Sequence, residues 1–169
     1  MASETKQNTT IQPNIGLDDE QRDSVVRLLN QHVANLHVLY VKTRNYHWNL
    51  TGPRFHTLHV FFEEQYDALA ESIDEIAERV RQLDGIAFGT MREFIKNATL
   101  QEDPGVIPDA NTMIHNLLND HEAIIQLLRV DVDNTEALND KGTSDFLTGK
   151  MEDHEKMAWM LRAHLSGEN

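Results

Sequence analysis

The stretch from His56 to Leu83 constrains the fold most, because it contains no glycine or proline and its apolar residues recur every three or four positions. This period predicts a single amphipathic helix, about 42 Å long at ~1.5 Å per residue. The apolar positions that define one side of it are Leu58, Phe62, Tyr66, Leu69, Ile73, Ile76, Val80 and Leu83.

A second stripe on the same helix consists of potential metal ligands. His59, Glu63, Asp74 and Glu78 fall within roughly 100° of the helix circumference. A solvated polar face is the simpler interpretation of any one of these pairs, because such spacings are common on exposed helices. His59 and Asp74 lie about 22 Å apart along the axis, whereas a metal ion holds its ligands within ~2 Å. One chain therefore cannot close a site from all four residues.

The spacing of these four residues is symmetric about a point between positions 68 and 69. A twofold axis at that point would place His59 and Glu63 of one chain against Glu78 and Asp74 of an antiparallel copy. We infer two identical metal sites shared across a homodimer interface.

Three further helices and a long connection complete the predicted fold. Residues 1–16 are polar and are expected to form a flexible N-terminal tail. The first helix should begin after Asp18 and run to about Tyr46, the third should run from about 110 to 138, and the fourth from about Thr143 to Leu165. Residues 84–109 are long enough to cross the bundle, with a short helix near 90–97. We expect an all-α, ferritin-like four-helix bundle over residues 17–165, with a long crossover containing a short extra helix between helices two and three, and a short C-terminal tail, 166–169.

Composition limits the chemistry. The net charge of −13, from 15 Lys and Arg against 28 Asp and Glu, repels phosphate and attracts cations. There is no cysteine, so a transition metal must be held by histidine and carboxylate, which suits iron, zinc or manganese. No glutamate is followed three residues later by histidine, so the intramolecular di-iron site of many carboxylate bundles is not expected. The sequence shows no membrane span and no secretory signal, which favours a cytoplasmic protein.

Two segments carry a family resemblance: YHWNLTGPRFHTLHVFFEEQYDALAESIDEIAERV and, downstream, GTSDFLTGKMEDHEKMAWMLRAHL. Together they resemble the Dps family of mini-ferritins, over about residues 17 to 165. The resemblance implies a hollow dodecamer built from twofold dimers, with a ferroxidase centre for two iron ions at each dimer interface, where zinc could substitute. It implies as ligands His47, His59 and Glu63 from one subunit, and Asp74 and Glu78 from its partner.

The resemblance also implies a function, and it leaves two alternative roles open for several residues. Family members oxidise Fe(II), preferentially with hydrogen peroxide rather than dioxygen, and store the ferric mineral, which protects against oxidative stress. Many relatives have aspartate where this chain has Glu63, and Trp48 resembles a tryptophan that is either an electron donor or an interface aromatic. His164 is either an auxiliary ligand or a packed or surface histidine. Four acids are candidates for pore or cavity-wall positions, although a solvated helix face explains them equally well: Asp120, Glu122, Asp131 and Asp133.

Two alternative functions stay open. A nucleoid-binding DNA-protection protein usually needs a basic tail, but the N-terminal tail has only Lys6, balanced by Glu4, and residues 166–169 contain no basic residue. We therefore expect weak or no DNA binding. A zinc or iron buffer without turnover is the other alternative, because the ligand set also suits Zn(II). Redox turnover with Fe(II) and peroxide would distinguish a ferroxidase from a buffer.

Overall fold

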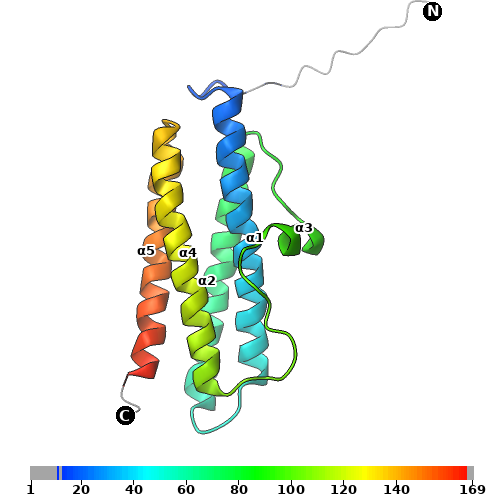
Figure 1. Ribbon diagram of the computed structural model, residues 1–169, viewed down its shortest axis with the longest axis vertical. Coiled ribbons are helices and arrows are strands. Elements are labelled where there is room, and N and C mark those ends of the chain that lie inside the picture. The colour runs from blue at the N-terminus through cyan, green and yellow to red at the C-terminus, as the bar shows by residue number, and fades with distance from the viewer. Residues whose placement is uncertain (1–10, 12, 167–169) are drawn as a thin grey trace, which may run out of the picture.

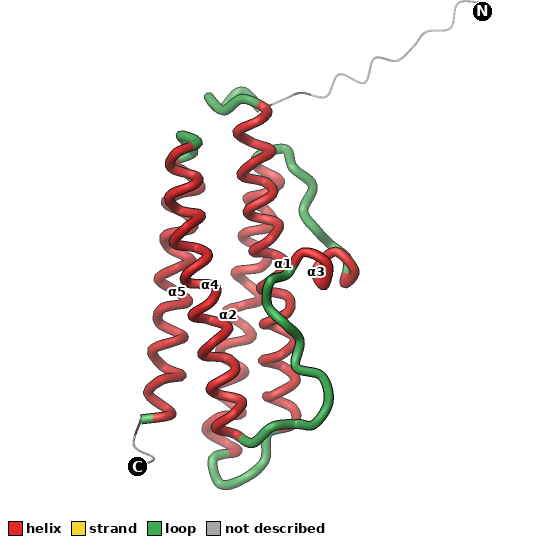
Figure 2. Tube along the Cα trace, in the orientation of Figure 1, coloured by secondary structure: helices red, strands yellow, loops and turns green. Residues whose placement is uncertain are grey.

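The computed structural model describes residue 11 and residues 13–166, and over this part the chain is entirely helical apart from turns and loops (Figures 1 and 2). The predicted fold class, a four-helix bundle with an extra short helix, is confirmed. The predicted tails, 1–16 and 166–169, lie largely outside the described residues. The helices are α1 (Asp19–Asn49), α2 (Phe55–Gln82), α3 (Met91–Asn97), α4 (Ala110–Ala137) and α5 (Lys141–Leu165).

The bundle consists of two helical hairpins. Helix α1 packs against α2, and α4 packs against α5, each pair being antiparallel (Figure 1). The crossover leaves the end of α2, runs along α1 with α3 resting on it, and enters α4 at the opposite end of the bundle (Figure 2). Helices α2 and α4 are consequently parallel, as the length of the crossover predicts.

The first helix begins where the sequence predicts and ends later. Asp18 and Gln21 form a capping box, in which the Gln21 N–H donates to Asp18 Oδ1 at 2.8 Å and the Asp18 N–H donates to Gln21 Oε1 at 2.9 Å. The helix continues to Asn49, and the Leu50 N–H closes the last turn on the Tyr46 carbonyl at 2.9 Å. His47 therefore lies on a regular helix, which fixes the direction of its side chain.

The turn between α4 and α5 is tighter than the sequence suggests. Asn139 adopts a left-handed conformation, with φ of 62°, and the Asp140 N–H donates to the Thr135 carbonyl at 3.0 Å. Asp140 then caps α5 by accepting the Thr143 N–H at 3.0 Å, so the helix starts at Lys141 and not at Thr143. Arg79 of α2 donates to the same Asp140 carboxylate at 3.2 Å, which ties the turn to the other hairpin.

Buried polar pairs join α1 to α4 within a core that is otherwise largely apolar. Lys42 donates to Asp120 Oδ2 at 2.7 Å, and His32 Nε2 lies 2.8 Å from Asp131 Oδ2. Asp131 is only 2% exposed, so its assignment to a pore, a cavity wall or a solvated face is wrong. Losing one partner of such a pair would leave a buried charge, so these pairs fix the register of the two hairpins. Large fully buried side chains include Tyr46, Phe62, Leu29, Leu36, Leu69, Ile76 and Ile114.

The crossover is fastened beside the end of α1. The Tyr46 hydroxyl donates to the Asp103 carboxylate, and Asn116 of α4 donates to the Tyr46 oxygen at 2.9 Å. Burial, followed by the Asp103 carboxylate, raises the pKa of Tyr46 above its ordinary value, so the phenol stays protonated as a donor. None of the described helices is both long enough and apolar enough to cross a membrane.

Candidate metal centre

Two predicted ligands, His47 and His59, meet across the α1–α2 hairpin. Their rings stack with centroids 3.7 Å apart at an angle of 19°. His47 Nδ1 donates to the His59 carbonyl at 2.8 Å, and His59 Nδ1 donates to the His47 carbonyl at 2.9 Å. A carbonyl can only accept, so these bonds assign the proton of each neutral ring to Nδ1 and leave the lone pair on Nε2. This arrangement is typical of metal-binding histidines, whose second nitrogen is fixed by a backbone or carboxylate acceptor.

Glu63 lies one turn beyond His59 on α2 and is exposed. The Tyr66 hydroxyl is 3.4 Å from Glu63 Oε1, and the Tyr66 ring contacts His47 edge-on, with centroids 5.2 Å apart. Tyr66 therefore borders both the imidazole pair and the carboxylate. This half of the predicted site combines two nitrogen donors with an adjacent, solvent-accessible carboxylate, a donor set that fits Fe(II).

The other two predicted ligands lie further along the same helix. Asp74 and Glu78 are exposed, and about 22 Å of helix separates Asp74 from His59 at ~1.5 Å per residue. Within the described residues, no three His, Asp or Glu side chains lie close enough to hold a metal ion. A single chain thus keeps the two predicted halves of the site apart, and the shared site stays a prediction that needs a second copy.

Trp48 follows His47 on α1 and lies on the outside of the bundle. It is 62% exposed, and the Arg44 guanidinium lies over its ring at 4.8 Å. The same guanidinium lies 5.2 Å from the Tyr66 ring and donates to the Tyr40 hydroxyl at 2.7 Å. These cation–π contacts hold a large aromatic surface next to the half-site, where a second protein surface could cover it.

His164 has a different environment from the predicted ligands. Its ring packs against Phe61 with centroids 4.6 Å apart, and its carbonyl accepts from Arg54 at 3.5 Å. Burial, and then the Arg54 charge, lower the pKa of His164. These contacts describe a packed histidine, and its role as an auxiliary ligand stays a prediction.

The structure brings together two histidines that the sequence did not single out. His121 of α4 and His154 of α5 are 0% and 2% exposed, and their Nδ1 atoms are 2.8 Å apart. Burial lowers the pKa of His121 to about 3. Burial is the main cause that lowers the pKa of His154 well below its ordinary value, and the Lys150 charge acts in the same direction. Both rings are therefore neutral at physiological pH.

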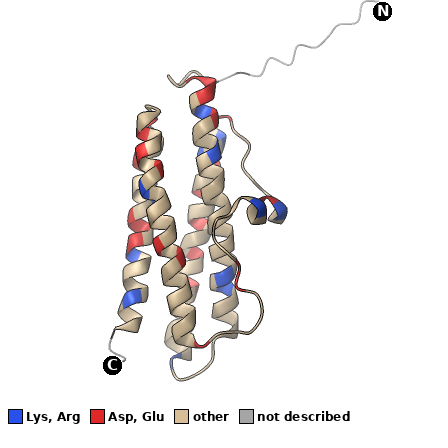
Figure 3. Cartoon of the chain, viewed as in Figure 1, with Lys and Arg blue, Asp and Glu red and all other residues tan. Residues whose placement is uncertain are grey.

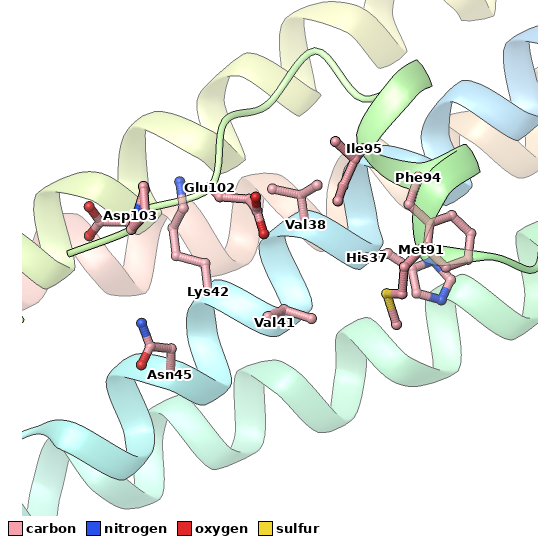
Figure 4. Close-up of a pocket in the computed structure, with 11 residues that line it drawn as sticks. His37, Val38, Val41, Lys42, Asn45, Met91, Phe94, Ile95, Glu102 and Asp103 are labelled. Atoms are coloured by element: carbon pink, nitrogen blue, oxygen red, sulfur yellow. The ribbon is translucent and has the colours of Figure 1, made fainter.

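A separate pocket of about 210 Å³ lies between α1, α3 and the crossover (Figure 4). Lys42, Glu102 and Asp103 line one end, and His37, Met91 and Phe94 line the other. The His37 and Phe94 rings stack at 3.6 Å and hold α3 on α1. The mixture of a lysine, two acids and an apolar wall does not resemble a metal site, so the His47–His59 pair is the stronger candidate.

Comparisons with known proteins decide the family. The ferritin-like domain family matches residues 26–168. The chain is 39% identical over 142 residues to "DNA protection during starvation protein 2" of Bacillus anthracis, covering 84% of this chain and 97% of that protein. The chain belongs to the Dps family of ferritin-like proteins.

Two other proteins are similar to this chain over most of its length. A low temperature-induced protein of Nostoc is 51% identical over 156 residues, covering 92% of this Dps chain and 87% of the relative. The crystal structure of a Vibrio cholerae Dps protein matches with a TM-score of 0.87 and 33% identity, covering 94% of this chain and 99% of that one. It is described as a member of a broad superfamily of ferritin-like diiron-carboxylate proteins.

Proposed function

We propose that this Dps protein is a cytoplasmic ferroxidase that oxidises Fe(II) at centres shared between two chains and stores the ferric product inside a dodecamer. The observation that carries the proposal is the reciprocal pair of hydrogen bonds between His47 and His59. Each bond commits one ring nitrogen to a backbone carbonyl and leaves Nε2 as a metal ligand. Packing alone would not require both rings to carry their proton on Nδ1 beside an exposed carboxylate.

The second half of each centre comes from a second copy. Antiparallel pairing of α2 about a point near residues 68 and 69 would set Asp74 and Glu78 of that copy against His59 and Glu63. Ala70 is exposed on the same face and would allow close approach of the two helices. This pairing accounts for two half-sites on one helix that are too far apart to serve one metal ion in a single chain.

Exposed apolar surface beside the half-site supports this pairing. Trp48 and Val41, two turns apart on one face of α1, are 62% and 47% exposed. Large apolar side chains that share an exposed face mark an interaction site. A second copy that covers this face would also shield the centre from bulk solvent.

The ligand set determines the chemistry. Fe(II) is the substrate, and the imidazole and carboxylate donors leave coordination positions free for the oxidant. Two ferrous ions and one hydrogen peroxide exchange two electrons, so that 2 Fe²⁺ + H₂O₂ + 2 H₂O gives 2 FeO(OH) + 4 H⁺. The pairwise transfer avoids releasing hydroxyl radical, which is why we propose peroxide as the preferred oxidant. Zn(II) would occupy the same ligands without turnover.

Charge supports iron handling more than DNA binding. Acidic side chains are spread along the helices, with fewer basic ones between them (Figure 3), and the whole chain carries a net charge of −13. Such a surface attracts Fe(II) and repels phosphate. Several relatives are named for DNA protection, and we propose that this protein protects by consuming Fe(II) and peroxide, without tight contact with DNA.

The test is anaerobic apo-protein mixed with Fe(II) and then with peroxide, while ferric absorbance is recorded. Wild type should oxidise iron quickly, and the double variant His47→Ala with His59→Ala should lose the fast phase. His115→Ala removes an exposed histidine of α4 and should behave as wild type. Equal slow rates in wild type and the double variant would refute the ferroxidase and favour a buffer.

A further inference from the structure

Tyr66 is the one member of the apolar series along α2 that carries a hydroxyl, since the others are aliphatic residues and Phe62. Its side chain is half-buried, beside the predicted ligands of the metal centre. Phenylalanine would pack the ring at this position equally well. Packing by itself therefore does not account for the hydroxyl.

The hydroxyl and the ring of Tyr66 contact two different predicted ligands. The hydroxyl donates to Glu63 Oε1 at 3.4 Å, and the three-residue spacing keeps both side chains on one face of α2. At 3.4 Å this bond is long, and hydrogen bonds around a site commonly tighten when the ligand binds. The ring meets His47 of α1 edge-on, with the ring planes at 87°. One side chain thus contacts an oxygen ligand and a nitrogen ligand that come from two helices.

The hydrogen bond restrains a carboxylate that is otherwise mobile. Glu63 is exposed, and a long exposed side chain loses conformational freedom when a metal ion fixes it. The Tyr66 hydroxyl engages Oε1 and leaves Oε2 for the metal ion. A donor that holds the carboxylate in advance reduces the free-energy cost of metal binding, as the hydrogen-bond partners of metal ligands generally do.

Arg44 and Tyr40 of α1 hold the Tyr66 ring from the neighbouring helix. The Arg44 guanidinium lies 5.2 Å from the centre of the Tyr66 ring and 5.5 Å from that of Tyr40. The two tyrosine rings meet edge-on, with centroids 6.1 Å apart. Arg44 Nη1 also donates to the Tyr40 hydroxyl at 2.7 Å, which fixes the guanidinium one turn along α1. The direction of the Tyr66 side chain is therefore set by contacts outside α2.

The position of Arg44 carries a cost in stability. Its Nε atom is buried and has no hydrogen-bond partner in the described part of the chain. A buried donor without a partner is unfavourable and is uncommon in folded proteins. An arrangement that leaves this donor unsatisfied while the guanidinium lies against Tyr66 indicates that the placement of Tyr66 serves more than stability.

We propose that Tyr66 is a positioning residue of the metal centre, which orients the Glu63 carboxylate through its hydroxyl and the His47 imidazole through its ring. Arg44 keeps Tyr66 in place. Tyr66 acts through these two ligands and does not itself bind the metal ion. The proposal rests on the proposed function, because it requires that Glu63 and His47 bind a metal ion.

The experiment is an anaerobic titration of the assembled full-length protein with Co(II), followed by the visible absorption of the bound ion. Tyr66→Phe keeps the ring and removes only the hydroxyl, and it should weaken Co(II) binding about 10-fold and alter the absorption bands. The midpoint of urea unfolding should stay at the wild-type value. Tyr66→Leu also removes the ring contact with His47 and should weaken binding further. Wild-type Co(II) affinity and spectrum in Tyr66→Phe would overturn the proposal.

A double-mutant cycle with Glu63→Ala shows whether the hydroxyl acts through Glu63. In the Glu63→Ala background, Tyr66→Phe should cause no further loss of Co(II) affinity, because the hydroxyl then has no carboxylate to hold. An equal loss in the wild-type and Glu63→Ala backgrounds would contradict the positioning role.

The double variant His47→Ala with His59→Ala separates failure of this proposal from failure of the proposed function. Co(II) binding that is lost in this variant but unchanged in Tyr66→Phe would refute the positioning role alone. Co(II) binding that is equal in wild type and in this variant would refute the metal centre itself, and the positioning role with it. Arg44→Met should weaken Co(II) binding in the wild-type background and have no effect in the Tyr66→Leu background; an equal effect in both would contradict the role of Arg44.

Discussion

The buried pair His121–His154 should make the protein lose stability in mild acid. Burial lowers the pKa of His121 from 6.5 in the unfolded chain to about 3 in the folded one. Between these two values the unfolded chain binds a proton that the folded chain excludes. The contribution of a depressed histidine pKa to stability is therefore present above pH 6.5 and is lost as pH falls toward 3.

The size of this effect follows from the same two values. At pH 5 the proton bound by the unfolded chain lowers the free energy of unfolding by about 2 kcal/mol relative to pH 7, for His121 alone. Below pH 3 this reduction in the free energy of unfolding reaches its limit of about 5 kcal/mol, at ~1.4 kcal/mol per pKa unit. His154 acts in the same direction, because burial also lowers its pKa.

The assay is urea unfolding at pH 7 and pH 5 at constant ionic strength, repeated at several protein concentrations to separate subunit dissociation from unfolding. In the double variant His121→Leu with His154→Leu, the difference between the two pH values should shrink by about 2 kcal/mol or more. His115→Gln, an exposed histidine on the same helix as His121, should leave the difference unchanged. An equal pH dependence in wild type and the double variant would refute the reasoning.

Three further predictions concern the site, the fold and DNA. Glu63→Asp keeps a carboxylate and should retain Fe(II) oxidation in a ferric-absorbance assay, whereas Glu63→Ala should lose most of it. If both rates are equal, Glu63 is not a ligand. Asp140→Ala removes the α5 cap and the Arg79 partner, and should cost about 1–2 kcal/mol in urea unfolding; a change below about 0.5 kcal/mol would contradict the capping role. In a gel-shift assay at low salt, plasmid mixed with the assembled protein should migrate as free plasmid. Tight retention of the plasmid would contradict the argument that the negative charge of the protein prevents DNA binding.

Helix positions were predictable because local rules set them. The apolar period over residues 56–83 and the Asp18–Gln21 capping box appear in the structure within a residue or two of their expected places. The start of α5 was misplaced because Asp140 serves both a left-handed turn and a cap. Local sequence also does not reveal that Arg79, from a distant helix, donates to the same Asp140 carboxylate.

Contacts between distant segments were less predictable. The His121–His154 pair joins residues 33 positions apart on different helices, and each residue by itself resembles any helical histidine. Asp131 looked like a surface acid because its partner, His32, lies on α1. The His47–His59 pair was foreseen through the family resemblance and a short hairpin, but the reciprocal carbonyl contacts could only come from the structure.

The most direct test of the central claim, a centre shared by two chains, is complementation between two inactive variants. One variant carries His47→Ala and His59→Ala, the other carries Asp74→Ala and Glu78→Ala, and both are co-expressed so that dimers mix. A mixed dimer regains one intact centre and destroys the other, so random mixing should restore about a quarter of the wild-type fast Fe(II) oxidation, while each variant alone shows none. Mixed dimers that assemble but stay as inactive as either parent would contradict the shared centre.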